Sequence, residues 1–134
     1  MLFRSELFAS SALTSLQGTS TQLLAYVDDH LLGAEGDSVA SNADQLQRAY
    51  NTLATHLATM GLSLDSAKTE CMHFTRNTRS QEHRTDVNII LPNALGPGND
   101  FTVVPSKLLR WLGLWFDSKL LWTEHCSQIG RAHV

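Results

Sequence analysis

The clearest pattern of apolar positions lies between residues 39 and 60. Apolar side chains recur there in alternating steps of four and three, at Val39, Ala43, Leu46, Tyr50, Leu53, Leu57 and Met60. This spacing places them on one face of an amphipathic helix. Asp37 or Ser38 can accept hydrogen bonds from the free amides of the first turn, and Gly61 follows the last apolar position as a left-handed cap. The pattern therefore predicts a helix whose two ends are both marked.

Two elements are predicted before this helix. Residues 1–17 contain neither proline nor glycine and favour a helix that ends at Gly18. Residues 21–27 form a short apolar run that is followed by Asp28 and Asp29 and then by a second apolar run. This arrangement predicts a hairpin with the acidic pair at its turn, so both carboxylates are expected at the tip of a strand.

The remainder of the chain alternates between short apolar runs and polar connections. A turn is predicted at Asp65-Ser66, after Leu62 and Leu64. Strands are predicted over residues 69–74, 87–91, 101–104 and 108–116, and the last two strands are expected to pair with each other. Residues 76–84 and 92–100 are predicted to be polar or turn-rich connections. The order of elements predicts an α+β fold, an antiparallel sheet with helices packed on one face.

Length and composition limit the class of protein. A chain of 134 residues suits one domain or part of one, and 43% hydrophobic with 17% charged residues is typical of globular proteins. No apolar run approaches the roughly 20 residues needed to cross a bilayer, and the start does not resemble a signal peptide. Two cysteines are too few for a disulfide framework. We therefore expect an intracellular protein without a membrane partner, and leave nucleus or cytoplasm open.

Charge is distributed unevenly along the chain. The net charge is -3, which alone disfavours contact with nucleic acid because phosphate binding depends on Lys and Arg. Up to residue 66 two bases stand against seven acids, a net charge of -5, so the remaining residues carry +2. An acidic half that holds a carboxylate pair fits a site that requires cations, and it equally fits an ordinary solvated surface.

The pair Asp28-Asp29 is the main candidate for chemistry. Two adjacent carboxylates at a strand tip repel each other unless a cation compensates them, and a hard divalent ion with oxygen ligands does so directly. Magnesium is the natural ion for such ligands. An isolated Asp-Asp pair is also common in solvated turns, so the pair alone leaves both interpretations open.

Three blocks along the chain carry a resemblance when they are taken in order. They are Tyr26-Val27-Asp28-Asp29, the stretch from Gly61 to Glu70, and the stretch from Leu109 to Trp122. These resemble the Tyr-x-Asp-Asp, Gly-Leu-x-x-x-x-x-Lys-Thr-Glu and Leu-Gly-aliphatic-x-aliphatic-Asp motifs of reverse transcriptases of the non-LTR retrotransposon type. The resemblance implies that residues 1–134 are the carboxy-terminal part of a polymerase palm, with the acidic hairpin, the following helix and a primer-grip-like hairpin.

The resemblance also implies roles for individual residues. Asp28 would bind both magnesium ions of a two-metal nucleotidyl transfer, and Asp29 would support one ion or orient its neighbour. Manganese is expected to substitute for magnesium. Lys68 resembles a lysine that protonates or steadies pyrophosphate, although a single lysine in a turn is often only a solvated charge. The partners of the complete enzyme would be an RNA or DNA template, a primer and deoxynucleoside triphosphates.

Further residues are expected to approach the primer, namely Tyr26, Val27, Leu112 and Gly113. The plainer interpretation makes Tyr26 and Val27 strand residues with one side buried. It also places Leu112, Leu114 and Phe116 on one core-facing side of a strand by simple alternation. Stacking of Trp111, Trp115 or Phe116 on bases is possible, but sheet packing is the favoured interpretation.

The family's remaining catalytic parts are not found in this sequence. The strand with the third metal-binding Asp, the nucleotide-selecting residues and the fingers lie upstream in the family, and the thumb lies downstream. We therefore expect this chain alone to be inactive as a polymerase. The alternative is an inactive retroelement remnant that serves at most as a folding or interaction module. No zinc site is expected, because the pairs Cys71 with His73 and His125 with Cys126 lack a usual ligand spacing.

Overall fold

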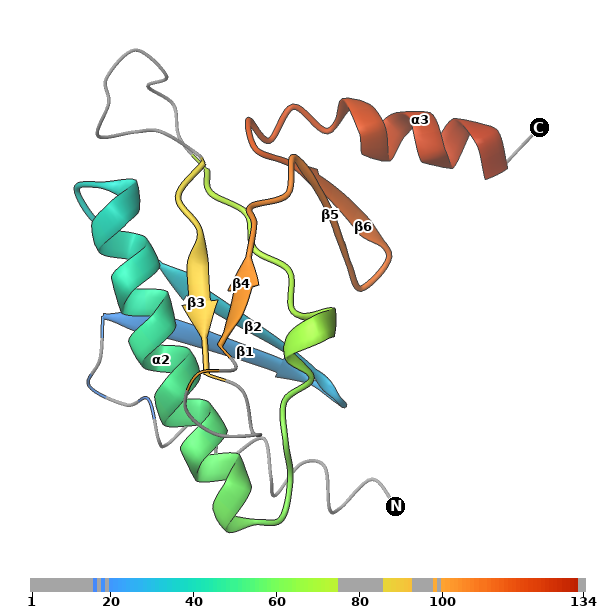
Figure 1. Ribbon diagram of the computed structural model, residues 1–134. Coiled ribbons are helices and arrows are strands. Elements are labelled where there is room, and N and C mark those ends of the chain that lie inside the picture. Colours follow the sequence, from blue (N-terminus) through green and yellow to red (C-terminus); the bar gives the residue numbers. More distant parts are fainter. Residues whose placement is uncertain are drawn as a thin grey trace.

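The structure is a computed structural model, and it describes Leu16, Gly18, residues 20–74, residues 86–92, Gly98 and residues 100–132. The described elements are short strands that follow one another in pairs, with one helix after the first pair and another after the last (Figure 1). They are β1 (Thr21–Tyr26), β2 (Asp29–Ala34), α2 (Val39–Thr59), the 3-10 turn η1 (Ser66–Lys68), β3 (Ile89–Leu91), β4 (Phe101–Val103), β5 (Leu108–Trp111), β6 (Leu114–Asp117) and α3 (Thr123–Ala132). The predicted α+β class is confirmed. The predicted loop 76–84, the predicted helix 1–17 apart from Leu16, and most of the connection 92–100 lie outside the described residues.

The described strands form three separate two-stranded antiparallel sheets, β1–β2, β3–β4 and β5–β6, in place of one sheet. The predicted pairing of residues 101–104 with 108–116 is wrong, because β4 pairs with β3. Residues 108–116 fold back on themselves instead. Leu112 and Gly113 both have positive φ, +48° and +83°, which is the conformation of a two-residue type I′ hairpin turn.

The strand predicted over residues 69–74 is also wrong. These residues follow η1 without joining any ladder, and a hydrogen bond from Ser106 N to Cys71 O (2.8 Å) ties them to the chain before β5. The predicted turn at Asp65-Ser66 is present as η1, which Asp65 caps by accepting from Ala67 N at 3.1 Å. Strand β3 is shorter than predicted, since it begins at Ile89 and not at Val87.

Helix α2 confirms the prediction at both of its ends. Ser38 Oγ accepts from Ser41 N at 3.1 Å and caps the first turn. At the other end Gly61 has φ +72°, and bonds from Gly61 N to Ala58 O and from Leu62 N to Leu57 O, both 3.0 Å, form a Schellman motif. Glycine adopts this left-handed conformation without steric cost, so it stops the helix cleanly.

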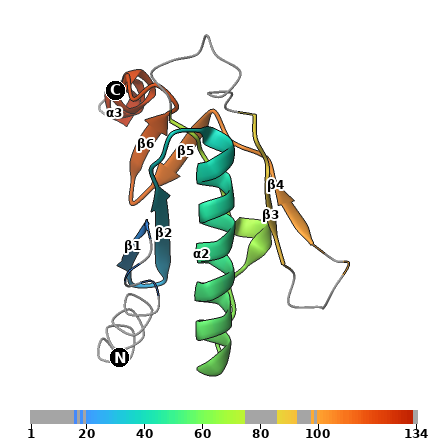
Figure 2. The same ribbon diagram turned by 90° about the vertical axis from the view of Figure 1, so that its left-hand side faces the viewer.

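The buried face of α2 is wider than the predicted stripe. Ala49 is buried together with five of the predicted positions, Val39, Ala43, Tyr50, Leu53 and Leu57. The physical reason is that the helix has neighbours on two sides, with β1–β2 on one and β3–β4 on the other (Figure 2). One helix therefore holds two otherwise separate strand pairs together.

Two hydrophobic clusters result from this sandwich. The first joins Leu53 and Leu57 of α2 to Leu23 of β1, together with Leu16 and Ala49. The second joins α2 to β3, β4 and the segment after η1, and it contains Ala43, Tyr50, Cys71, Ile89, Leu91 and Val103. Leu32 and Leu64 pack against both clusters, so the two form a continuous core around the helix.

The β5–β6 hairpin continues into α3, which packs on β6. Asp117 orders the connection, because its carboxylate accepts from the backbone N–H groups of Lys119, Leu121 and Trp122 at 3.0–3.1 Å. These bonds hold Leu120 and Trp122 at positive φ and place the Trp122 ring 5.4 Å from that of Phe116. Neither described helix combines the length and the apolar character required to span a bilayer.

Candidate functional site

The acidic pair lies at the tip of the β1–β2 hairpin. Tyr26 and Asp29 are its last paired residues, so Val27 and Asp28 form the two-residue loop. Val27 has φ +54°, while Asp28 does not have positive φ, so the first position of the loop holds a β-branched residue in the left-handed region. Glycine normally fills this first position, and a β-branched residue there is strained. Asp28 and Asp29 are both exposed, so the carboxylates are presented to solvent by a strained turn.

Two of the flanking residues differ from the plainer prediction. Tyr26 is 61% exposed and Val27 is 57% exposed, so neither is a strand residue with a buried side. Register explains the exposure of Tyr26: it shares the outer face of β1 with Leu24, whereas Leu23 faces α2. Both side chains are therefore available at the surface beside the acidic pair.

A cleft of about 880 Å³ lies beside this turn. Residues from three distant parts of the chain line it: the turn itself, the stretch from Leu62 to Glu70, and the β5–β6 hairpin. They include Val27, Asp28, Asp29, Leu62, Asp65, Lys68, Glu70, Leu109, Arg110, Trp111 and Leu112. Residues 27–29, most of residues 62–70 and residues 109–112, each a part of one of the three sequence blocks, therefore meet at one cleft.

Lys68 lines this cleft next to Asp65. Its Nζ lies 3.5 Å from Asp65 Oδ2, and the short turn η1 holds the two residues three positions apart. Tyr50 on α2 steadies the turn through a 3.2 Å hydrogen bond between its hydroxyl and Ser66 Oγ. The Lys68 side chain is 86% exposed, so its ion pair with Asp65 is a weak surface contact that a competing anion can displace.

The hairpin side of the cleft corrects another prediction. Leu112 sits in the turn, and Leu112 and Leu114 are 44% and 40% exposed, so they do not form a core face with Phe116. The face turned to the rest of the molecule carries Leu109, Trp111 and Phe116. On the other face Arg110 stacks over the Trp115 ring, with Cζ 5.7 Å from its centroid.

Metal-binding groups are dispersed around the cleft. Asp28, Asp29, Asp65 and Glu70 all line it, yet no three His, Cys, Asp or Glu side chains within the described part of the chain lie close enough to share an ion. Asp28 and Asp29 thus remain a pair that would need at least one further ligand from elsewhere to enclose a magnesium ion.

The two Cys/His pairs, Cys71 with His73 and His125 with Cys126, lie in different parts of the fold. Cys71 and His73 are buried in the core, where His73 Nε2 donates to Val87 O at 2.7 Å. Burial raises the pKa of the Cys71 thiol to about 11, which disfavours the thiolate that metals bind. His125 and Cys126 belong to α3, and His125 Nδ1 accepts from Trp115 N at 3.4 Å.

Comparisons with protein-family models, with curated proteins and with solved structures found no match to this chain.

Sequence reasoning did not assign a role to several residues that shape this region. The sequence predicted only a turn at Asp65, yet Asp65 forms an ion pair with Lys68. The spacing of three residues between the two opposite charges was the signal that could have predicted this pair. Asp117 belongs to the third block, but nothing in the sequence indicated that its carboxylate accepts hydrogen bonds from three backbone amides. These bonds depend on the course of the backbone after β6, which residue spacing does not predict. His30 lines the cleft because it directly follows the acidic pair on β2.

Proposed function

We propose that this chain supplies the metal-binding hairpin and the primer-facing hairpin of an RNA-directed DNA polymerase palm. The observation that carries the proposal is that residues 27–29, most of residues 62–70 and residues 109–112, far apart in sequence, line one cleft. The proposed reaction is magnesium-dependent, template-directed nucleotidyl transfer, in which two metal ions lower the charge barrier between a primer hydroxyl and a nucleoside triphosphate.

The strained turn supports this proposal. Backbone strain costs stability and is concentrated where function requires a particular geometry. At Val27 the left-handed conformation turns the chain within two residues, so that the carboxylates of Asp28 and Asp29 follow the strand tip directly. An ordinary solvated turn would be expected to hold glycine at this position.

Each residue has a proposed role. Asp28 binds both ions, and Asp29 supports one of them or orients its neighbour. Lys68, across the cleft, neutralises charge that develops on the departing pyrophosphate. Tyr26 beside the acidic pair, and Leu112 with Gly113 at the tip of the β5–β6 hairpin, contact the primer strand.

The first test measures the proposed metal site alone. Manganese added to the isotope-labelled chain is expected to broaden the amide signals of the turn around Asp28, and Asp28→Asn is expected to abolish that effect. Asp44→Asn is the matched control, because Asp44 is an exposed carboxylate of α2 paired with Arg48 and lies outside the cleft. Broadening that ignores the turn, or that is the same in Asp28→Asn, contradicts the metal assignment.

The second test concerns catalysis. The chain alone is expected not to extend a primer at any magnesium concentration, because the described residues bring no third metal ligand close to Asp28 and Asp29 and include no fingers or thumb to clamp the template. Such positioning contributes about 7 to 11 kcal/mol to comparable reactions. Adding an upstream strand with the third Asp, fingers and a thumb from a related enzyme is expected to restore extension that depends on Asp28.

The competing proposal is a retroelement remnant without catalysis, at most a folding or interaction module. It predicts that the rebuilt enzyme stays inactive, or that its activity does not change in Asp28→Asn. Extension by the chain alone would contradict both proposals, since it would require a complete site within these 134 residues.

A further inference from the structure

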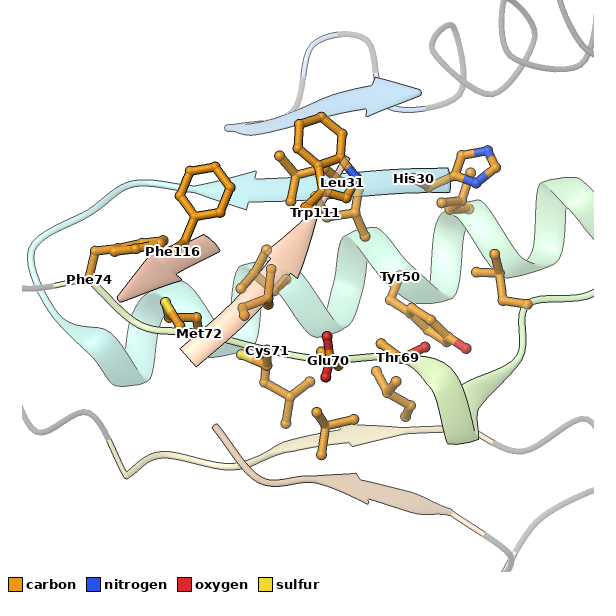
Figure 3. A pocket seen from close by; sticks show the side chains of 18 residues that line it. His30, Leu31, Tyr50, Thr69, Glu70, Cys71, Met72, Phe74, Trp111 and Phe116 are labelled. Atoms are coloured by element: carbon orange, nitrogen blue, oxygen red, sulfur yellow. The ribbon is translucent and has the colours of Figure 1, made fainter. Parts of the chain in front are cut away.

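A second, smaller cavity lies between the core and the β5–β6 hairpin, with a volume of about 300 Å³. The extended residues 69–74 supply one wall (Figure 3). Their side chains alternate: Cys71 and His73 are buried in the core, whereas Met72 is half-buried and Phe74 is 51% exposed. Cys71, Met72 and Phe74 all line the cavity, with Met72 and Phe74 on the more exposed side of this segment.

The opposite wall is the inner face of the β5–β6 hairpin. The β5–β6 register places Leu109 directly opposite Phe116, and Trp111 lies two residues along the same face. Core side chains such as Leu53 of α2 and Leu91 of β3 close the remaining sides, and β2 contributes His30, Leu31 and Leu32. The volume falls at the lower end of the roughly 300–1,000 Å³ typical of ligand pockets, and the lining is apolar as in most of them.

Glu70 is the one carboxylate among the described residues that line this cavity. It is exposed, and it has no hydrogen bond or ion pair with any other described residue. Two other polar lining groups are bonded, since Tyr50 bonds to Ser66 at 3.2 Å and Thr69 Oγ1 donates to Asp65 O at 3.0 Å. His30 of β2 lines the cavity as well, and no ion pair joins it to Glu70. An uncompensated negative charge thus stands beside an apolar cavity of ligand size.

We propose that this cavity binds a small organic cation with an aromatic body. The rings of Trp111, Phe74 and Phe116 and the thioether of Met72 enclose the aromatic body, and these groups favour stacked and sulfur–aromatic contacts. The ammonium group lies beside the Glu70 carboxylate. This proposal does not rest on the polymerase proposal, because it uses neither Asp28 nor Asp29.

The experiment compares two probes that share the same aromatic body and differ in their polar group, a cationic ammonium in one and a neutral hydroxyl in the other. Titration of the isotope-labelled chain with 2-naphthylmethylamine, and separately with 2-naphthalenemethanol, yields a Kd and a map of shifted amides for each probe. Both maps are expected to centre on residues 70–74 and 109–116. The amine is expected to bind about two- to fivefold more tightly than the alcohol, the range for an exposed ion pair.

Variants assign the preference to Glu70. Glu70→Gln is expected to make the two Kd values equal, while Glu35→Gln preserves their ratio, because Glu35 is an exposed carboxylate outside both cavities. Phe74→Ala is expected to weaken both probes, and its half-exposed side chain makes the substitution compatible with folding. Asp28→Asn leaves both Kd values unchanged, which separates this result from the metal test.

Two outcomes overturn the proposal. One is the absence of shifts at the lining residues with either probe. The other is a Kd ratio that is near one in the native chain, or that is the same in Glu70→Gln as in the native chain, since the carboxylate would then have no part in binding.

Discussion

The central position of α2 leads to a quantitative prediction for Leu53→Ala. Leu53 is 1% exposed and packs with Leu23 of β1 and Leu57 of the same helix. The substitution removes three buried carbons, worth roughly 0.8 kcal/mol each, or about 2.4 kcal/mol. The cavity left behind adds to this loss because its surroundings collapse only in part, and measured losses for buried Leu→Ala range from about 2.7 to 5.0 kcal/mol. We expect the free energy of unfolding to fall by about 3 to 4 kcal/mol.

Urea unfolding followed by far-ultraviolet circular dichroism measures this loss, because α2 is the longest helix described. Leu24→Ala is the matched control. It deletes the same atoms from a leucine next to Leu23 in β1, but Leu24 is 55% exposed on the outer face of that strand. The control is expected to change stability by no more than about 0.5 kcal/mol. Equal losses in the two variants would show that α2 does not pack against β1–β2, and the cleft beside the acidic turn would lose its support.

Three further outcomes follow from local contacts. The pKa of Asp117 is lowered, chiefly by the hydrogen bond that its carboxylate accepts from Leu121 N–H. The stabilisation from the ionised carboxylate is therefore present at neutral pH and is lost as pH falls through that lowered pKa. In an NMR titration, the Leu121 amide signal is expected to shift only at pH values below the ordinary range of aspartate. Ser38→Ala removes the cap of α2 and is expected to cost about 1 kcal/mol in urea unfolding, whereas Ser38→Thr retains most of it. Iodoacetamide at pH 8 is expected to modify exposed Cys126 quickly and Cys71 only after denaturation, because burial raises the pKa of Cys71 to about 11; equal rates in mass spectrometry would contradict the buried assignment.

Local features of the sequence determined the elements whose signals are local. Helix α2 follows from its apolar spacing and from caps within three residues of each end, and both ends are observed. The acidic hairpin follows from two apolar runs around a polar pair, and the carboxylates are at its tip. Period and capping depend on neighbours in sequence, so they can be read without knowledge of the fold.

Only the tertiary structure decided which strands pair and which faces are buried. Residues 101–103 pair with 89–91 and not with 108–116, because the turn at Leu112-Gly113 lets the later segment pair with itself. Residues 69–74 have the composition of a strand, yet their burial against the core and a single bond to Ser106 replace a ladder. The cleft depends on the same long-range contacts: Asp28, Lys68 and Leu112 come together because α2 and the core position three separate segments. Each of these contacts joins residues far apart in the chain, whereas periodicity reports only on near neighbours.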